Sequence, residues 1–158
     1  FPAIALIAIR QDPDYGFQAI LFLFIVVWTA DTAAFFTGRL LQGPKLAPSI
    51  SPNKTWSGLI GGTLAAGAAG VAFGAWLGHT SLPILGGISV MLALIAQVGD
   101  LGESFIKRFF GVKNTSGLIP GHGGVLDRLD GLVFAAMGAG LVAIVTNPLK
   151  PGGALLIW

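Results

Sequence analysis

Residues Gly99 to Asp130 read GDLGESFIKRFFGVKNTSGLIPGHGGVLDRLD, a polar and glycine-rich segment in a chain that is otherwise strongly apolar. The segment contains eight of the 16 Asp, Glu, Lys and Arg residues among the 158 residues of the chain. A charged side chain such as that of Asp100 would cost roughly 2.5 to 3.5 kcal/mol at the centre of a lipid-facing helix on insertion scales. A cluster of such residues therefore indicates a hydrated cleft at helix ends.

The carboxylates of this segment fall at helical spacings. If the apolar helix before the segment continues, Asp100, Ser104 and Lys107 share one face at positions i, i+4 and i+7. Asp127 and Asp130 also share a face if the next helix begins near Asp127. The glycines and the proline between the helices allow a backbone to approach a ligand closely. The pattern predicts two carboxylate-bearing helix ends joined by a glycine-rich loop.

Converging carboxylates need a cation, because without one they repel each other and take up protons. Oxygen ligands suit a hard cation such as Mg²⁺, which keeps several waters and also binds substrate phosphates. We expect Asp100, Asp127 and Asp130 to be metal ligands for Mg²⁺, alone or with a second cation. From the residues alone, the prediction extends to metal-assisted phosphoryl chemistry at a membrane surface, with nearby basic residues offsetting phosphate charge.

At these residues the segment resembles the motif of the phosphatidate cytidylyltransferases, also called CDP-diacylglycerol synthases. The matching residues are Ser104, Lys107, Arg108, Lys113, Ser116, the run Pro120 to Gly124, Asp127, Arg128 and Asp130. One position departs from the family motif, which usually has Asp directly after the second lysine, where this chain has Asn114. The resemblance implies transfer of a cytidylyl group from CTP to phosphatidate, giving CDP-diacylglycerol and pyrophosphate.

Such a reaction assigns roles to the residues of the motif. The lipid phosphate is already an anionic nucleophile, so the site mainly has to align two polyanions and neutralise the departing pyrophosphate. The expected catalytic residues are Asp100, Ser104, Lys107, His122, Asp127 and Asp130. Among these, Ser104 would support the metal ligands, and His122 suits loop ordering slightly better than proton transfer. Contacts to phosphate through a side chain or close backbone are expected from Lys107, Arg108, Gly121, Gly123, Gly124 and Arg128.

A second polar segment, Gly38 to Thr55, ends in ISPNKT before Trp56. A helix beginning around Lys54 to Trp56 would present its first amides, together with the Lys54 ammonium, to an anion. By composition alone such a basic loop is usually only a solvated cytoplasmic loop. Its likeness to a second segment of the family implies that Ser51, Asn53, Lys54 and Thr55 hold the nucleotide.

The composition indicates an all-α integral membrane protein, because 54% of the residues are apolar and 10% are charged. We expect one domain over residues 1–158, a polytopic helical bundle of about four full transmembrane helices plus a truncated N-terminal one. The full spans are residues 17–37, 56–77, 84–98 with an amphipathic extension to about 110, and 129–145. The run at residues 3–9 is shorter than the roughly 20 residues that cross a bilayer. Small residues four apart, from Gly58 to Gly78 and from Gly131 to Ala143, indicate close helix packing.

The basic residues predict the orientation. Seven of the nine lie in the two polar segments and two, Arg10 and Lys150, lie opposite, which places the charged side in the cytoplasm of a multi-pass inner-membrane protein. CTP, phosphatidate and the bilayer are the expected partners, and the small net charge of +2 gives no reason to expect nucleic acid. A homodimer is compatible with the sequence. Asp31 suits two readings equally, a carboxylate at the interface beside Arg39 or one that faces the cleft of Asp100.

Several alternatives stay open on the residues. Asp127, Arg128 and Asp130 alone could be a helix cap, and Asp100, Glu103 and Lys107 could be a surface network. A CTP-dependent lipid or polyprenol kinase would use similar residues, and an ion-coupled transporter would place the carboxylates along an ion path. The chain has neither GxxxxGK[ST] nor a Rossmann fingerprint after a strand, and it has no cysteine for thiolate metal sites.

Overall fold

The computed structural model describes residues 1–79, 81–111 and 126–158, with side chains of the last range described from residue 130. The chain forms α1 (Pro2–Arg10), α2 (Gly16–Leu41), β1 (Lys45–Ala47), β2 (Ser51–Thr55), α3 (Trp56–Trp76), α4 (Leu82–Phe109), α5 (Leu126–Thr146) and α6 (Gly153–Leu156). The helices α2, α3 and α4 are long and apolar enough to cross a membrane. The predicted all-α polytopic membrane fold is therefore confirmed, while the count of about four spans stays a prediction.

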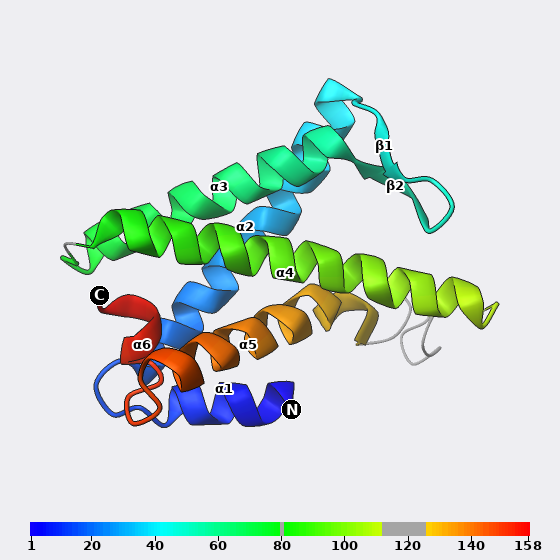
Figure 1. Cartoon of the computed structure of the whole chain (residues 1–158). Helices are drawn as coiled ribbons and strands as arrows, with labels where there is room; N and C mark the ends of the chain where they lie inside the picture. Colours follow the sequence, from blue (N-terminus) through cyan, green and yellow to red (C-terminus); the bar gives the residue numbers. More distant parts are fainter. Residues whose placement is uncertain (80, 112–125) are drawn as a thin grey trace.

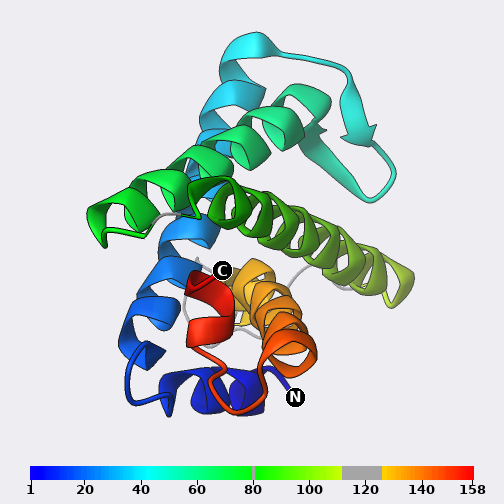
Figure 2. The same ribbon diagram turned by 60° about the vertical axis from the view of Figure 1, so that its left-hand side comes forward.

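The helices pack into one bundle around α2 and α4 (Figure 1). Helix α3 packs between α2 and α4, and α5 packs against α4 and also against α1, from the other end of the sequence. Figure 2 shows α1 beneath α5 in a second view. The core of the bundle lies where α2, α4 and α5 meet, and its members are apolar side chains with almost no exposed surface, among them Phe22, Leu23, Val26, Leu85, Leu92, Ala135 and Ala139.

The small residues of α3 form the closely packed ridge that the sequence predicts. Gly58, Gly62, Gly70 and Gly74 are all buried. A Cβ atom added at Gly62 would lie 2.6 Å from the carbonyl oxygen of Ala30 in α2. The equivalent atoms at Gly70 and Gly74 would collide with side chains of α4. Helix α3 can approach both neighbours this closely only because these positions lack side chains.

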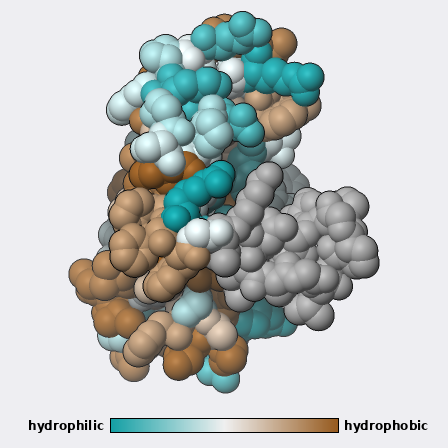
Figure 3. Space-filling view, turned by 90° about the vertical axis from the view of Figure 1, so that its right-hand side faces the viewer, coloured by the Kyte–Doolittle hydropathy of each residue, from teal (hydrophilic) through white to brown (hydrophobic). Residues whose placement is uncertain are grey.

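The segment expected to be a loop from Gly38 to Thr55 is partly regular. Helix α2 continues to Leu41 and ends at Gln42, whose backbone is left-handed with φ of 45°. Strands β1 and β2 then pair antiparallel, with Lys45 opposite Thr55. Pairing satisfies backbone groups that a free loop would leave to solvent. Figure 3 shows hydrophilic side chains gathered over this hairpin at the top of the view, with hydrophobic ones below.

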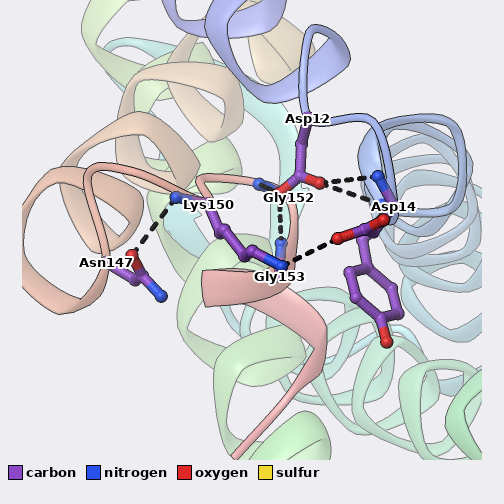
Figure 4. A network of polar contacts seen from close by, with 7 residues as sticks. Asp12, Asp14, Asn147, Lys150, Gly152 and Gly153 are labelled. Atoms are coloured by element: carbon purple, nitrogen blue, oxygen red, sulfur yellow. Dashed lines mark hydrogen bonds and ion pairs between the residues drawn. The ribbon is translucent and has the colours of Figure 1, made fainter.

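At the other end of the bundle, Asp12 joins two turns that are far apart in the sequence (Figure 4). Its carboxylate accepts hydrogen bonds from the backbone N–H groups of Asp14 and Tyr15 between α1 and α2, and of Gly152 and Gly153 before α6. The closing residues Ala154, Leu155 and Leu156 are buried, because the Asp12 contacts hold α6 against the bundle.

Candidate active site

A cavity of about 840 Å³ lies between α2, the hairpin, the start of α3 and the middle of α4. This volume is in the range of small-molecule sites. The residues of α2 that line it recur at helical spacing, from Asp31 through Phe35 and Arg39 to Gln42, so they form one face. At 1.5 Å per residue that face is about 16 Å long. The charged residues lining the cavity are Asp31, Arg39, Lys45, Lys54 and Asp100.

An ion pair across the cavity joins the two polar segments that the sequence singled out. The Nζ atom of Lys54 on β2 lies 2.5 Å from Oδ2 of Asp100 on α4. The two side chains are 25% and 35% exposed, so the pair is partly screened from solvent. The structure therefore brings together a residue expected at the nucleotide and a residue expected at the metal.

Asp100, which lines the cavity, lies near carboxylates of two other helices. The carboxyl of Asp130, at the start of α5, lies within hydrogen-bonding reach of Asp100. Asp31 lies close to Gly131, the residue after Asp130: a Cβ atom added to that glycine would lie 3.9 Å from Oδ2 of Asp31. Asp31 also lies close enough to Asp100 and Lys54 to interact with their charges. Of the two readings of Asp31, the structure supports the one in which it faces the cleft of Asp100.

The corner around Asp100 fits a cation that a substrate helps to bind. In the ranges 1–79, 81–111 and 130–158, no three His, Asp or Glu side chains are close enough to hold a metal ion by themselves. Mg²⁺ in phosphoryl-transfer sites is usually held by one or two carboxylates, with waters and substrate phosphates completing its coordination. Asp100 and Asp130 could supply that pair. The third expected ligand, Asp127, has its side chain outside the described residues.

Other residues of the α4 motif lie away from the cavity wall. Lys107 pairs with Glu103 one turn earlier, at 2.7 Å, with side chains only 14% and 20% exposed. This pair is one part of the network considered as an alternative, whereas Asp100 pairs with Lys54. The Nε atom of Arg108 donates to the carbonyl oxygen of Ile50 at 3.5 Å, so Arg108 ties the end of α4 to the hairpin. Ser104 is half-buried and does not line the cavity. The predicted shared face of α4 exists, and its member at the cavity is Asp100.

The hairpin places the expected nucleotide-binding residues unequally. Asn53, Lys54 and Thr55 line the cavity, whereas Ser51 does not. The hydroxyl of Thr55 is the N-cap of α3, since it accepts a hydrogen bond from the N–H of Gly58 at 3.1 Å.

The first amides of α3 were expected to face an anion. The N–H of Gly58 instead donates to Thr55, and the N–H of Trp56 donates to the carbonyl of Pro44 at 3.0 Å. These two amides are already satisfied within the fold, so that expectation is wrong for them. The positive charge of the hairpin at the cavity is that of Lys45 and Lys54.

Some cavity residues were not assigned to the site from the sequence. Arg39 lies over the ring of Phe35, 5.9 Å from the ring centroid, and both line the cavity. Gln97 is a buried amide on α4 whose Nε2 donates to the hydroxyl of Thr63 at 3.4 Å. Gln97 could have been predicted from the sequence, because it is a polar residue in an apolar span, about one turn before Asp100.

Part of the expected site lies outside the described residues. This part comprises the side chains of Asp127 and Arg128 and all of Gly121, His122, Gly123 and Gly124. Their roles stay predictions.

Comparison with known proteins relates the chain to one family. Residues 1–145 match the model of the cytidylyltransferase family. The chain is 52% identical over 139 residues to the phosphatidate cytidylyltransferase of Brucella suis. The aligned region covers 86% of this chain and 50% of that protein. The chain is 46% identical over 130 residues to the enzyme of that name from Haemophilus influenzae, covering 79% of this chain and 45% of the relative. The chain thus spans about half the length of these relatives.

Proposed function

Because the chain belongs to the cytidylyltransferase family, we propose that its cavity is the site at which a cytidylyl group passes from CTP to phosphatidate. The observation that carries the proposal is the Lys54–Asp100 ion pair, which joins the two motif segments across one cavity. The names of the relatives support the choice of substrates. CDP-diacylglycerol and pyrophosphate would be the products.

The charges of the cavity suit two polyanions. Arg39, Lys45 and Lys54 supply positive charge near the hairpin for the triphosphate. Asp100 and Asp130, with Asp127, would hold Mg²⁺, which supplies charge neutralisation at the phosphates and at the leaving pyrophosphate. An oxygen of the lipid phosphate attacks the α-phosphorus of CTP, and the bond from that phosphorus to the pyrophosphate oxygen breaks. The nucleophile is already ionised, so the residues have to orient and neutralise rather than remove a proton.

The distribution of basic residues supports a cytoplasmic site. Arg39, Lys45, Lys54 and Arg108 all belong to the hairpin end of the bundle, on α2, the hairpin and the end of α4. Arg10, the last residue of α1, and Lys150, in the turn before α6, lie at the opposite end. Because basic residues favour the cytoplasmic face, the cavity would open toward the compartment that contains CTP.

Labelled CTP tests the proposal with the purified protein in phosphatidate-containing vesicles. We expect label from the α-phosphate of CTP to enter the lipid and label from the γ-phosphate to appear in pyrophosphate. Entry of the γ-label into lipid would contradict the proposal and support the kinase. Asp100→Asn should abolish incorporation, whereas Asp14→Asn, which removes an acidic group at the other end of the bundle, should leave it unchanged.

A further inference from the structure

We propose that Lys54 is a placeholder for the metal ion: its ammonium and the metal compete for Asp100, and the ammonium moves to the nucleotide phosphates when the metal binds. The inference rests on the proposed function and adds a second role for Lys54 to that of a nucleotide contact. Its basis is the geometry of the ion pair and of the acidic corner around it.

The first step is competition between the Lys54 ammonium and the metal ion for Oδ2 of Asp100. The ammonium nitrogen of Lys54 lies 2.5 Å from Oδ2 of Asp100. A Mg²⁺ ion bound by a carboxylate lies about 2.0 to 2.1 Å from its oxygen. Two cations cannot both contact that oxygen at these distances without strong repulsion. Binding of a metal at Oδ2 therefore favours departure of the ammonium.

The second step is the charge balance of the corner. Asp100 interacts with the charges of both Asp130 and Asp31, and Asp31 lines the cavity with it. The acidic group one turn further along α4, Glu103, pairs with Lys107. Within the described ranges, the ion pair with Asp100 is made by Lys54. One ammonium thus offsets part of the repulsion among these carboxylates.

The third step is the mobility of the lysine. A lysine has a flexible four-carbon stem that carries a compact point charge, so its ammonium can move several ångströms while the backbone stays in place. The Lys54 side chain lines a cavity of about 840 Å³ and is only partly buried. The hairpin also contacts α4 elsewhere, through β2 itself and through the turn before it, where the carbonyl of Ile50 accepts from Arg108. Lys54 can therefore release Asp100 without detaching the hairpin from α4.

The effect of Lys54 on metal binding therefore reverses when the nucleotide binds. Without nucleotide, Lys54 competes with the metal and weakens its binding. With nucleotide, the same ammonium has phosphate oxygens to bind, so it no longer opposes the metal and strengthens the ternary complex instead. Metal and nucleotide would then bind in a coupled manner, each favouring the other.

Mn²⁺ binding to the nucleotide-free protein, measured by electron paramagnetic resonance, tests the inference. We expect Lys54→Met and Lys54→Gln to tighten Mn²⁺ binding about tenfold, the effect of one adjacent opposite charge on a carboxylate. Lys45→Met removes the same charge from the same cavity, but Lys45 does not pair with Asp100, so it should change binding less than about twofold on the same reasoning. In the presence of CTP, Lys54→Met should weaken Mn²⁺ binding.

The outcomes separate this inference from the proposed function. Mn²⁺ binding to the protein that is absent even in Lys54→Met and with CTP present, or that survives Asp100→Asn, would overturn the metal assignment itself. Binding that needs Asp100 but responds equally to Lys54→Met and Lys45→Met would overturn only the placeholder role. Both Lys54 variants should unfold within a few degrees of the unsubstituted protein. If one of them fails to fold, the Mn²⁺ binding of the other still tests the inference.

Discussion

The replacement of Asp12 by Asn tests how strongly the end of the bundle opposite the cavity is held. Oδ1 of Asp12 accepts from the N–H groups of Asp14 and Tyr15 at 3.0 and 3.1 Å. Oδ2 accepts from Gly152 and Gly153, both at 3.0 Å and both buried. An asparagine has one oxygen, so it can satisfy one of these pairs and must direct its NH₂ group toward the other.

The expected loss follows from these contacts. Hydrogen bonds to a charged group contribute about 1.5 to 3 kcal/mol each. Losing two of them, at the lower value because the turns can relax, should destabilise the protein by about 3 kcal/mol. Unfolding of the protein in detergent by sodium dodecyl sulfate, followed by circular dichroism, would measure this loss.

The neighbouring ion pair provides a matched control. Lys150 Nζ lies 2.8 Å from Asp14 Oδ2, but both side chains are more than half exposed. Asp14→Asn should therefore leave the unfolding midpoint unchanged. Equal effects of the Asp12 and Asp14 substitutions, or no effect of either, would refute the reasoning that burial and four donors make Asp12 different.

The same site predicts a dependence on pH. Burial acts to raise the pKa of Asp12, but the four backbone donors together outweigh it and lower the pKa below its usual value of 3.8. A lowered folded pKa gives stability that is fully present above 3.8 and is lost as pH falls through the folded value. The stability difference between the unsubstituted protein and Asp12→Asn should therefore shrink as the pH falls below 3.8.

Two further substitutions test the packing and the wall of the cavity. Gly62→Ala places a Cβ 2.6 Å from the Ala30 carbonyl oxygen and 3.3 Å from Nε2 of Gln97. Gly62→Ala should destabilise the protein by about 1 to 3 kcal/mol and lower kcat, whereas Gly87→Ala, with open space at its Cβ, should lower neither stability nor kcat. Gln42→Gly relieves a left-handed backbone and should stabilise by about 0.5 kcal/mol in unfolding. Because its amide lines the cavity, it should also raise the KM for CTP, and an unchanged KM would show that this amide does not contact the nucleotide.

The spans were predictable from the sequence, whereas the hairpin was not. Length and hydropathy define α2, α3 and α4, and the extension of α4 beyond the apolar run is visible in its helical spacing. Strands β1 and β2 are three and five residues long and mostly polar, without the apolar alternation that marks a strand. Their pairing depends on the turn geometry and on contacts with α3 and α4, which no local pattern contains.

The site was predictable as a set of segments but only partly as a set of contacts. The motifs singled out Lys54 and Asp100, and the structure joins them. The position of Asp31 was open, because the register of α2 against α4 decides whether a carboxylate in its second half meets the cavity or the interface. Arg108 shows the opposite case: its charge suits phosphate, yet its position at the end of α4 brings it to the carbonyl of Ile50.

The glycine ridge of α3, which the sequence indicated only as a packing surface, also builds the cavity. A Cβ at Gly58 would lie 2.8 Å from the carbonyl oxygen of Ala34, and both residues line the cavity. Gly62, one turn further, is in contact with α2 at Ala30 and with α4 at Gln97. In lipid, helices associate through close packing of small residues rather than through burial of apolar surface from water. The approach of three backbones at these glycines therefore fixes the separation of α2, α3 and α4, and with it the distance across which the charged side chains one turn away can meet.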